Sequence, residues 1–259
     1  KRPDRPPAVG IGDRADPYLY LRSQSEFRQE MEYLAKTGYT PISLYQLKEY
    51  FQSRNPAVLP KKPVVISFDD GSTDWFEFVY PLLSKLNFKA TFFIITNDEV
   101  RGQFITGRAP LSWEQIRQMA QHKDRAGRTL FDFESHSHNH ISLADAAMQS
   151  MKSNDGKTLR HELAESMRVL QQQLGKKPSF IALPYGAGGF DQEPDTQVFP
   201  LIKAVTQELG YMGIRTSRSD IPNDLSTDSY KIGAQIIIYS STTMGEFRDR
   251  LNRLATNNP

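Results

Sequence analysis

The sequence predicts an α/β fold with a mainly parallel sheet, closed as a barrel or open as a doubly wound sheet. Short runs of β-branched and aromatic residues alternate along the chain with longer segments of helical periodicity, and strands separated by helices form parallel sheets. The length of 259 residues also suits a single α/β barrel, for which about 250 residues are typical. We therefore expect one domain over residues 1–259. Its first 17 residues, which are rich in Pro, Gly and charge, are expected to be an irregular lead-in.

Two capped helices are expected first. Ser23 with Glu26, and Ser43 with Gln46, fit the Ser-x-x-Glu/Gln capping box ahead of apolar residues at helical spacing. Gly38 stands where the first of these helices should end. A short extended piece is expected between the two helices.

From about residue 63 onward, strands and helices alternate. The predicted strands are 64–68, 90–95, 131–134, 179–183, 212–214 and 231–238. The predicted helices are 74–86, 113–121, 159–174, 199–209 and 243–254. Pro81 is expected to break or kink the first of these helices, Asp74 to cap it, and Ser112 to cap the second.

Composition and charge exclude several classes of protein. Lys and Arg total 32 against 30 Asp and Glu, and this near balance gives no argument for a nucleic-acid partner. No run of 18 or more apolar residues predicts a membrane span. Because there is no cysteine, disulfides, thiolate catalysis and Cys-ligated zinc are excluded.

Three unusual loops follow predicted strands: "DDG" at 69–71, "SHSHNH" at 135–140 and "PYG" at 184–186. In α/β folds the loops after the carboxyl ends of parallel strands converge, and ligands bind there. We therefore expect the three loops to lie close together.

The histidine-rich loop predicts a metal site. His136 and His140 have a spacing that lets both imidazoles face one ion, and Asp69 or Asp70 would complete a two-His, one-Asp set with open coordination positions. Zinc is the preferred ion, with the other divalent first-row metals Co, Ni, Mn and Fe as alternatives. His138 is expected to stay outside the ligand set. The alternative interpretation is a solvated polar loop with a chance excess of histidine.

Two adjacent carboxylates at a strand end repel each other unless a cation or a proton separates their roles. A turn is the simpler interpretation of "DDG", but a bound dication would let one Asp ligate the ion while the other takes a proton from water. The main-chain N–H of Tyr185 could hold an oxyanion at the neighbouring strand end, although "PYG" alone is more typical of a turn.

The motifs "SFDDG", "KATFFI", "SHSHNH" and "LPYG", in this order, resemble the polysaccharide deacetylases of the NodB-homology type, carbohydrate esterase family four. Upstream, "FRQEMEYLAKTGYTPISLYQLKEYF" and "LPKKPVVISFDDG" are similar to the bacterial poly-β-1,6-N-acetylglucosamine deacetylase branch. The resemblance covers roughly residues 18–255. It implies a distorted barrel of seven strands, a (β/α)7 fold of the polysaccharide deacetylase type.

The resemblance also implies roles. Asp69 would be the general base, Asp70, His136 and His140 the metal ligands, and Tyr185 an oxyanion donor through its main chain. The reaction would be metal-dependent N-deacetylation of a polysaccharide that contains N-acetylglucosamine, releasing acetate. Poly-β-1,6-N-acetylglucosamine is the favoured substrate, with peptidoglycan or chitin-like oligomers as alternatives. Such substrates imply an extracytoplasmic location, in the periplasm, at the cell surface or secreted.

Two departures from the family pattern matter. Many members carry an arginine that orients the base two residues before the Pro-Tyr pair, where this chain has Ala182. Many also supply a general acid from a late Leu-x-His motif, but the late strand here, "AQIIIYSS", has no histidine. In the poly-glucosamine branch that histidine lies in a Tyr-His pair near the N-terminus, which would fall upstream of Lys1. The alternatives are that His161 or His138 replaces it, although a surface role is the simpler interpretation of His161 in its long helix, or that the protein is slow or inactive.

Two other functions stay open, and these departures favour the first of them. One is a carbohydrate-binding or scaffold module that retains the barrel and metal site with little or no turnover. The other is a divalent-metal hydrolase that acts on a different acyl or amide substrate with the same ligands.

Overall fold

The computed structural model describes residues 22–104, 109–153, 157–186, 195–219 and 223–257. The predicted lead-in at 1–17 lies outside these residues. Within the described part of the chain, no helix combines the length and the apolar character needed to cross a membrane.

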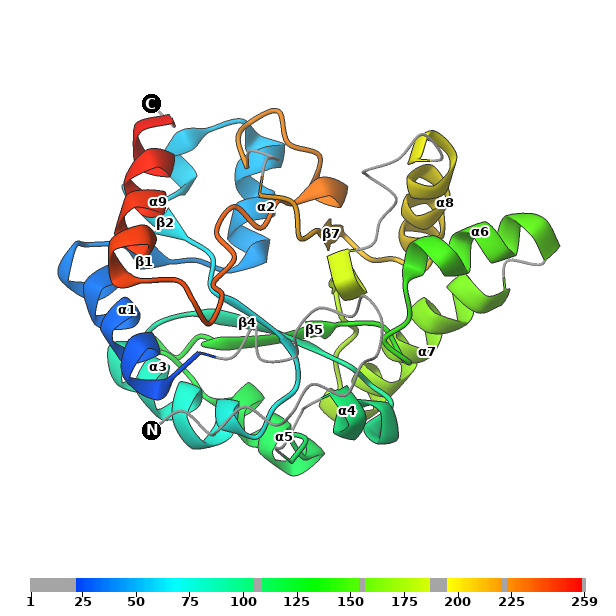
Figure 1. The fold of residues 1–259 in the computed structure, drawn as a ribbon, viewed down its shortest axis with the longest axis horizontal. Coiled ribbons are helices and arrows are strands. Elements are labelled where there is room, and N and C mark those ends of the chain that lie inside the picture. The colour runs from blue at the N-terminus through cyan, green and yellow to red at the C-terminus, as the bar shows by residue number, and fades with distance from the viewer. Residues whose placement is uncertain (1–21, 105–108, 154–156, 187–194, 220–222, 258–259) are drawn as a thin grey trace.

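The strands form two parallel sheets. In the described residues they are β1 (Thr40–Pro41), β2 (Pro63–Val64), β3 (Ser67–Asp70), β4 (Ala90–Ile94), β5 (Phe131–Ser135), β6 (Phe180–Ala182) and β7 (Gly213–Arg215). β1 pairs with β2, and the other five form a sheet in the order β3-β4-β5-β6-β7, so that β3 and β7 are its two edges. This curled half-barrel of parallel strands, surrounded by helices, confirms the predicted α/β architecture (Figure 1).

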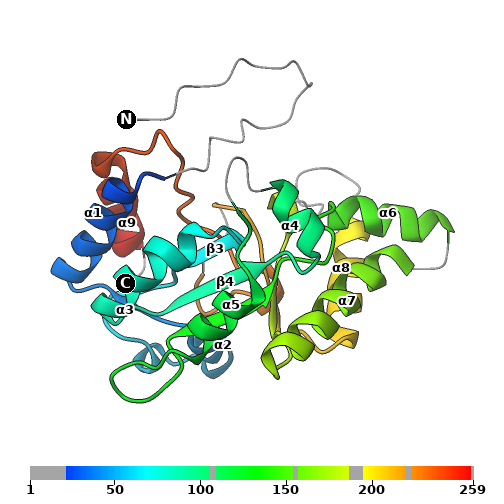
Figure 2. The ribbon, with the colours of Figure 1, turned by 90° about the horizontal axis from the view of Figure 1, so that it is seen from below.

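Helices cover the outside of the curled sheet and close its ends (Figures 1 and 2). The α-helices of the described residues are α1 (Gln24–Lys36), α2 (Leu44–Ser53), α3 (Tyr80–Leu86), α4 (Asp98–Phe104), α5 (Trp113–Gln121), α6 (Leu143–Ser153), α7 (Lys157–Leu174), α8 (Asp195–Glu208) and α9 (Met244–Asn257). Shorter helical segments are η1 (Pro56–Val58), the π-helical η2 (Trp75–Val79), η3 (Pro184–Gly186) and η4 (Ser229–Lys231). α1 and α9, distant in sequence, pack side by side in both views.

The predicted capping residues form most of the expected contacts. The Ser23/Glu26 and Ser43/Gln46 boxes are both complete, and Ser112 caps α5 in a third box. Asp74 is an exception: it precedes η2 with no capping hydrogen bond from its side chain, and its carboxylate accepts instead from Ser72 Oγ at 3.2 Å. The prediction of a side-chain cap at Asp74 is therefore wrong.

The late strand predicted at 231–238 is also wrong. Only Ile232 forms a bridge, to Arg215 of β7. The side-chain amide of Asn223 then donates to Gly233 O at 2.8 Å and accepts from Gly233 N at 2.9 Å. Because both main-chain groups of Gly233 are occupied by a side chain, they cannot continue a strand ladder.

The strand register sorts the core onto two faces. Phe92 of β4 is fully buried and stacks on its register partners Phe68 and Phe133, with ring centroids 5.1 and 5.2 Å apart. This outer face packs against the helices of the main core cluster. Side chains alternate along a strand, so Phe93 points to the opposite, inner face, where it packs with residues of α2 and β6. Asp69 is the register partner of Phe93 and shares that inner face.

Candidate active site

The three loops selected from the sequence meet at the carboxyl edge of the curled sheet. Asp69 and Asp70 are the last two residues of β3, His136 follows β5 directly, and Tyr185 follows β6. The parallel direction of the strands produces this meeting, because every strand ends at the same edge. Arg215, which ends β7, joins them at the far edge of the sheet.

Asp70, His136 and His140 form a compact group whose ligand atoms all lie within 4.8 Å of one another. Asp70 Oδ1 is 3.3 Å from Nε2 of His136 and 3.3 Å from Nε2 of His140. The two imidazoles are buried, with 3% and 7% of their side-chain surface exposed, whereas Asp70 keeps 41%. The surrounding protein therefore encloses the two imidazoles, and the group is open to solvent on the side of the Asp70 carboxylate.

The donor set fits a divalent first-row metal. Ligands about 2.0–2.1 Å from a tetrahedral zinc ion lie roughly 3.3 Å from each other, which matches both distances from Asp70 Oδ1. Nδ1 of His136 lies 2.9 Å from the carbonyl oxygen of Ala182. Since a carbonyl only accepts, Nδ1 carries a proton, and Nε2 is the nitrogen that faces Asp70 and would bind an ion once deprotonated.

The electrostatics of the group favour a cation. Burial and the neighbouring His136 lower the pKa of His140 to about 4, so its imidazole is neutral at pH 7. Burial also opposes a charge on His136, but the carboxylates of Asp69 and Asp70 outweigh it and raise the pKa of His136. Burial opposes ionisation of Asp70 as well, yet the hydrogen bond and charge of His136 lower the pKa of Asp70. Two carboxylates thus draw positive charge into this position.

Asp69 has an ion-pair partner that the sequence interpretation missed. Arg215 Nη2 donates to Asp69 Oδ2, and the guanidinium carbon lies 5.2 Å from the centre of the Phe93 ring. Asp69 Oδ1 is buried and accepts no hydrogen bond from the described residues. One oxygen of Asp69 is therefore fixed, and the other remains available as an acceptor.

This chain has no arginine at position 182, but Asp69 still has an ion-pair partner, and the strand register explains why. Ala182 of β6 is the register partner of Arg215 on β7, and register partners in adjacent strands project from the same face. The arginine expected at Ala182 therefore has an equivalent at the same level on the neighbouring strand. The signal in the sequence was a charged residue closing the apolar strand "MGIR", the same pattern that identified the aspartates.

Tyr185 lies beside the metal-ligand group. The residue is 64% exposed, and its ring is centred 4.6 Å from the ring of His140. Its backbone is left-handed, with φ of 57°. The contact with His140 places Tyr185 at the open side of the group, where the predicted oxyanion role of its main-chain N–H stays a prediction.

Backbone strain is concentrated at this edge. Six non-glycine residues in the described chain have positive φ, and four of them belong to these loops: Asp70, Ser137, His140 and Tyr185. Such conformations persist only where surrounding contacts impose them, and they cluster at functional sites.

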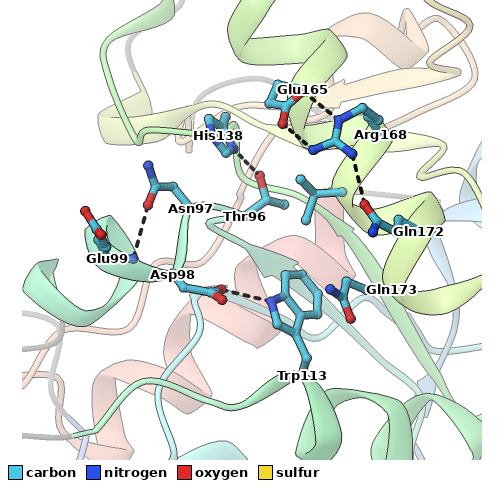
Figure 3. A pocket seen from close by; sticks show the side chains of 11 residues that line it. Thr96, Asn97, Asp98, Glu99, Trp113, His138, Glu165, Arg168, Gln172 and Gln173 are labelled. Atoms are coloured by element: carbon cyan, nitrogen blue, oxygen red, sulfur yellow. Dashed lines mark hydrogen bonds and ion pairs between the residues drawn. The ribbon is translucent and has the colours of Figure 1, made fainter.

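His138 is not a member of the Asp70, His136 and His140 group. Its Nδ1 lies 3.0 Å from Thr96 Oγ1, and its ring is centred 5.8 Å from that of His161. Figure 3 shows His138 at a groove of about 470 Å³ between the loop after β4 and α7, in which Asp98 pairs with Trp113, and Glu165 with Arg168. Neither His138 nor His161 belongs to the Asp70, His136 and His140 group.

Comparisons with known proteins point to one family. The sequence profile of the family described as polysaccharide deacetylase matches residues 57–211. The chain is 29% identical over 164 residues to the Bacillus subtilis protein YxkH, covering 63% of this chain and 50% of that protein. It is 27% identical over 175 residues to a poly-β-1,6-N-acetyl-D-glucosamine N-deacetylase of Staphylococcus aureus, covering 68% of this chain and 57% of that enzyme. The chain thus spans about half the length of these curated relatives.

Among solved structures, a de-N-acetylase from Aggregatibacter actinomycetemcomitans superposes with a TM-score of 0.69 at 20% identity, covering 93% of this chain and 94% of that one. At this identity the likeness concerns the fold. The family profile extends over more than half of the chain and includes β3, β5 and β6, whose carboxyl ends carry the site. The chain belongs to the polysaccharide deacetylase family, a family of enzymes.

Proposed function

We propose that this protein removes N-acetyl groups from a polysaccharide containing N-acetylglucosamine, in a metal-dependent reaction that releases acetate. The observation that carries the proposal is the juxtaposition of the Asp70, His136 and His140 group with an arginine-paired Asp69. Family membership supports the reaction class. The name of the Staphylococcus aureus relative supports poly-β-1,6-N-acetylglucosamine as the favoured substrate, with peptidoglycan or chitin-like oligomers as alternatives.

Asp70, His136 and His140 would hold the ion, with zinc preferred over cobalt, nickel, manganese or iron. Bound there, a divalent ion supplies Lewis acidity toward a carbonyl oxygen. Asp69 takes the proton from the attacking water, while Arg215 holds Oδ2 in place. The main-chain N–H of Tyr185 donates to the oxygen that becomes negative as the acetamide is attacked. The carbon–nitrogen bond then breaks as the leaving nitrogen takes up the proton that Asp69 accepted from the water, giving acetate and a free glucosamine amine.

The Arg215 pair also bears on the alternative of a binding or scaffold module. Ala182 had favoured that alternative, because no arginine stands at its position to orient the base. Since Arg215 fills this need from the next strand, the pair supports turnover. An acetylated polysaccharide of this kind is an extracytoplasmic substrate, so we infer action at the cell surface, in the periplasm or in secreted form.

The test is an acetate-release assay on β-1,6- and β-1,4-linked N-acetylglucosamine oligomers. We expect release from the β-1,6 series to be the faster, to stop after treatment with EDTA and to return when zinc is added. The metal content of the same samples is measured in parallel. Zinc and oligomer binding without acetate release at any pH would overturn the proposal and leave the binding module in its place.

A further inference from the structure

The loop that carries both histidines of the metal-ligand group is held by a buried carboxylate on a helix. Glu162 of α7 is only 2% exposed. Its Oε2 accepts from the main-chain N–H of Asn139 at 2.7 Å and of His138 at 3.2 Å. Its Oε1 accepts from Asn139 Nδ2 at 2.6 Å. All three donors lie between His136 and His140.

We propose that Glu162 is a positioning residue for the metal site: it fixes the 137–139 loop and so sets where His136 and His140 present their Nε2 atoms. This inference rests on the proposed function, because it requires that the two histidines bind a metal. Glu162 itself is not a member of the Asp70, His136 and His140 group.

The loop needs an external clamp because its backbone is strained. Ser137 and His140 have φ of 63° and 52°, a region in which a residue with a Cβ atom is disfavoured. Within the loop, Ser137 N donates to Ser135 Oγ at 3.2 Å, and His140 N donates to Ser137 Oγ at 3.1 Å. These local bonds fix the two ends of the loop, whereas the N–H groups in its middle are directed at Glu162.

α7 is suited to impose this geometry. Ser166, one turn after Glu162 and on the same helix face, has its hydroxyl 2.7 Å from that of Ser135, which immediately precedes His136. Leu159, Leu163 and Leu170 of the same helix are fully buried, so the helix is anchored in the core. One rigid face of α7 therefore holds both the start and the middle of the loop.

The loop after β4 secures the other side. Asn97 Nδ2 donates to Asn139 Oδ1 at 2.8 Å, and Asn97 N donates to the carbonyl oxygen of His138 at 3.1 Å. The Asn139 amide is thereby fixed in one orientation: its oxygen faces Asn97 and its NH₂ group faces Glu162. Because the orientation is fixed, the hydrogen bond from Asn139 to Glu162 can be tested by exchanging its donor and acceptor.

The experiment measures the dissociation constant for Zn²⁺ by competition with a chelating dye. In Glu162→Gln, the side-chain NH₂ group would face the NH₂ group of Asn139. Because outer-shell partners of metal ligands contribute about 10- to 100-fold to affinity, we expect the zinc dissociation constant to rise by that factor. The d–d absorption bands of the Co²⁺-loaded variant should also move, since they report the coordination geometry.

Asn139→Asp alone places two carboxylates opposite each other and should weaken zinc binding as well. In the double variant, Glu162→Gln with Asn139→Asp, the amide introduced on α7 donates to the carboxylate introduced in the loop. That carboxylate still accepts from Asn97, so most of the affinity should return. Glu165→Gln is the matched control: it removes a carboxylate from the same helix, but one paired with Arg168 and not with the loop. Its zinc affinity should equal that of the wild type.

Melting temperatures with zinc and with EDTA separate positioning from general stability. A purely structural role would lower both temperatures equally, whereas a positioning role reduces the increase that zinc produces. Unchanged zinc affinity in Glu162→Gln, or a double variant no better than the sum of its singles, would overturn the inference. If Glu162→Gln does not fold, unchanged affinity in Asn139→Asp has the same force. Wild-type protein that binds no zinc would instead overturn the metal site itself.

Discussion

Arg215 donates a hydrogen bond to Asp69 across the inner face of the sheet, and this contact joins the two edge strands, β7 and β3. In a flat sheet of five strands these edges would be far apart. The curl of the half-barrel brings them together over Phe93, on which the guanidinium rests. The shape of the sheet is thus a condition for the orientation of the proposed base.

The first prediction concerns this pair. Replacing Arg215 with Met leaves Asp69 free to rotate, and a misplaced catalytic group can cost about 10²-fold in rate. We expect kcat for acetate release to fall by that order while zinc uptake is retained, because Arg215 is not in the ligand group.

A relocated arginine provides the control for that loss. Ala182 is level with Arg215 and shares its face, so Arg215→Ala combined with Ala182→Arg should recover part of the activity that Arg215→Ala loses. Wild-type kcat in Arg215→Met would show that Asp69 needs no orienting partner.

The second prediction separates the roles of the two adjacent aspartates. Asp69→Asn removes the proposed base, and general bases contribute about 10²- to 10⁴-fold, so acetate release should fall by that factor with zinc content unchanged. Asp70→Asn removes a ligand atom that lies 3.3 Å from both imidazole nitrogens, so zinc occupancy should fall first. Metal analysis and the acetate assay on the same samples distinguish the two. Normal turnover in Asp69→Asn would mean that the roles are wrongly assigned.

The third prediction concerns the turn that follows these aspartates. Gly71 has φ of 119°, and a Cβ atom there would lie 2.6 Å from Cδ of Arg101, a side chain that is 2% exposed. Gly71→Ala should therefore lower the free energy of unfolding by about 1–3 kcal/mol and weaken zinc binding through the adjacent Asp70.

Gly38→Ala is the matched comparison. Gly38 also has positive φ, of 80°, but a Cβ atom added there meets nothing within 4 Å. It should lose some stability and no zinc affinity when both variants are measured by urea unfolding and dye competition. Equal zinc affinity in the two variants would show that the turn does not position Asp70.

Short sequence patterns were enough to select three loops of the candidate site. The aspartate pair, the histidine spacing and the Pro-Tyr turn each lie at the end of a recognisable strand, and the parallel topology brings them together without further information. The capping boxes at Ser23 and Ser43 formed for the same reason, since both partners lie within four residues.

Contacts between segments that are distant in the sequence could not be predicted from local patterns. Arg215 and Asp69 are 146 positions apart, and only the register of β6 with β7 shows that the arginine replaces Ala182. The side chain of Asn223 occupies the main-chain groups of Gly233 and so prevents the expected late strand. The apolar periodicity at 231–238 gives no sign of this contact. Glu162 looks like an ordinary helix residue until α7 is packed against the histidine loop.

The last prediction is a pH dependence of stability caused by Glu134, on the inner face of β5. Its carboxylate is 1% exposed and accepts from Tyr45 Oη at 2.9 Å, Ser179 N at 2.6 Å and Phe180 N at 2.8 Å. Burial is the largest influence and raises the pKa of Glu134 from 4.5 to about 7, against the opposing effect of these hydrogen bonds. Between these two values the folded protein keeps a proton that the unfolded chain has released. Stability therefore falls as pH rises through this window.

The size of the effect follows from the shift. One pKa unit corresponds to about 1.4 kcal/mol, so the change from pH 4.5 to pH 8 should be on the order of 3 kcal/mol. Glu134→Gln carries no charge at any pH, and its amide can still accept from the two main-chain N–H groups and donate to Tyr45. Urea unfolding in EDTA should therefore show Glu134→Gln gaining on the wild type by about that amount across the window. Glu208→Gln, at an exposed ion pair with Arg160, should show no such gain. A difference between Glu134→Gln and the wild type that stays constant from pH 4.5 to pH 8 would mean that Glu134 is ionised throughout and that its three donors fully compensate its burial.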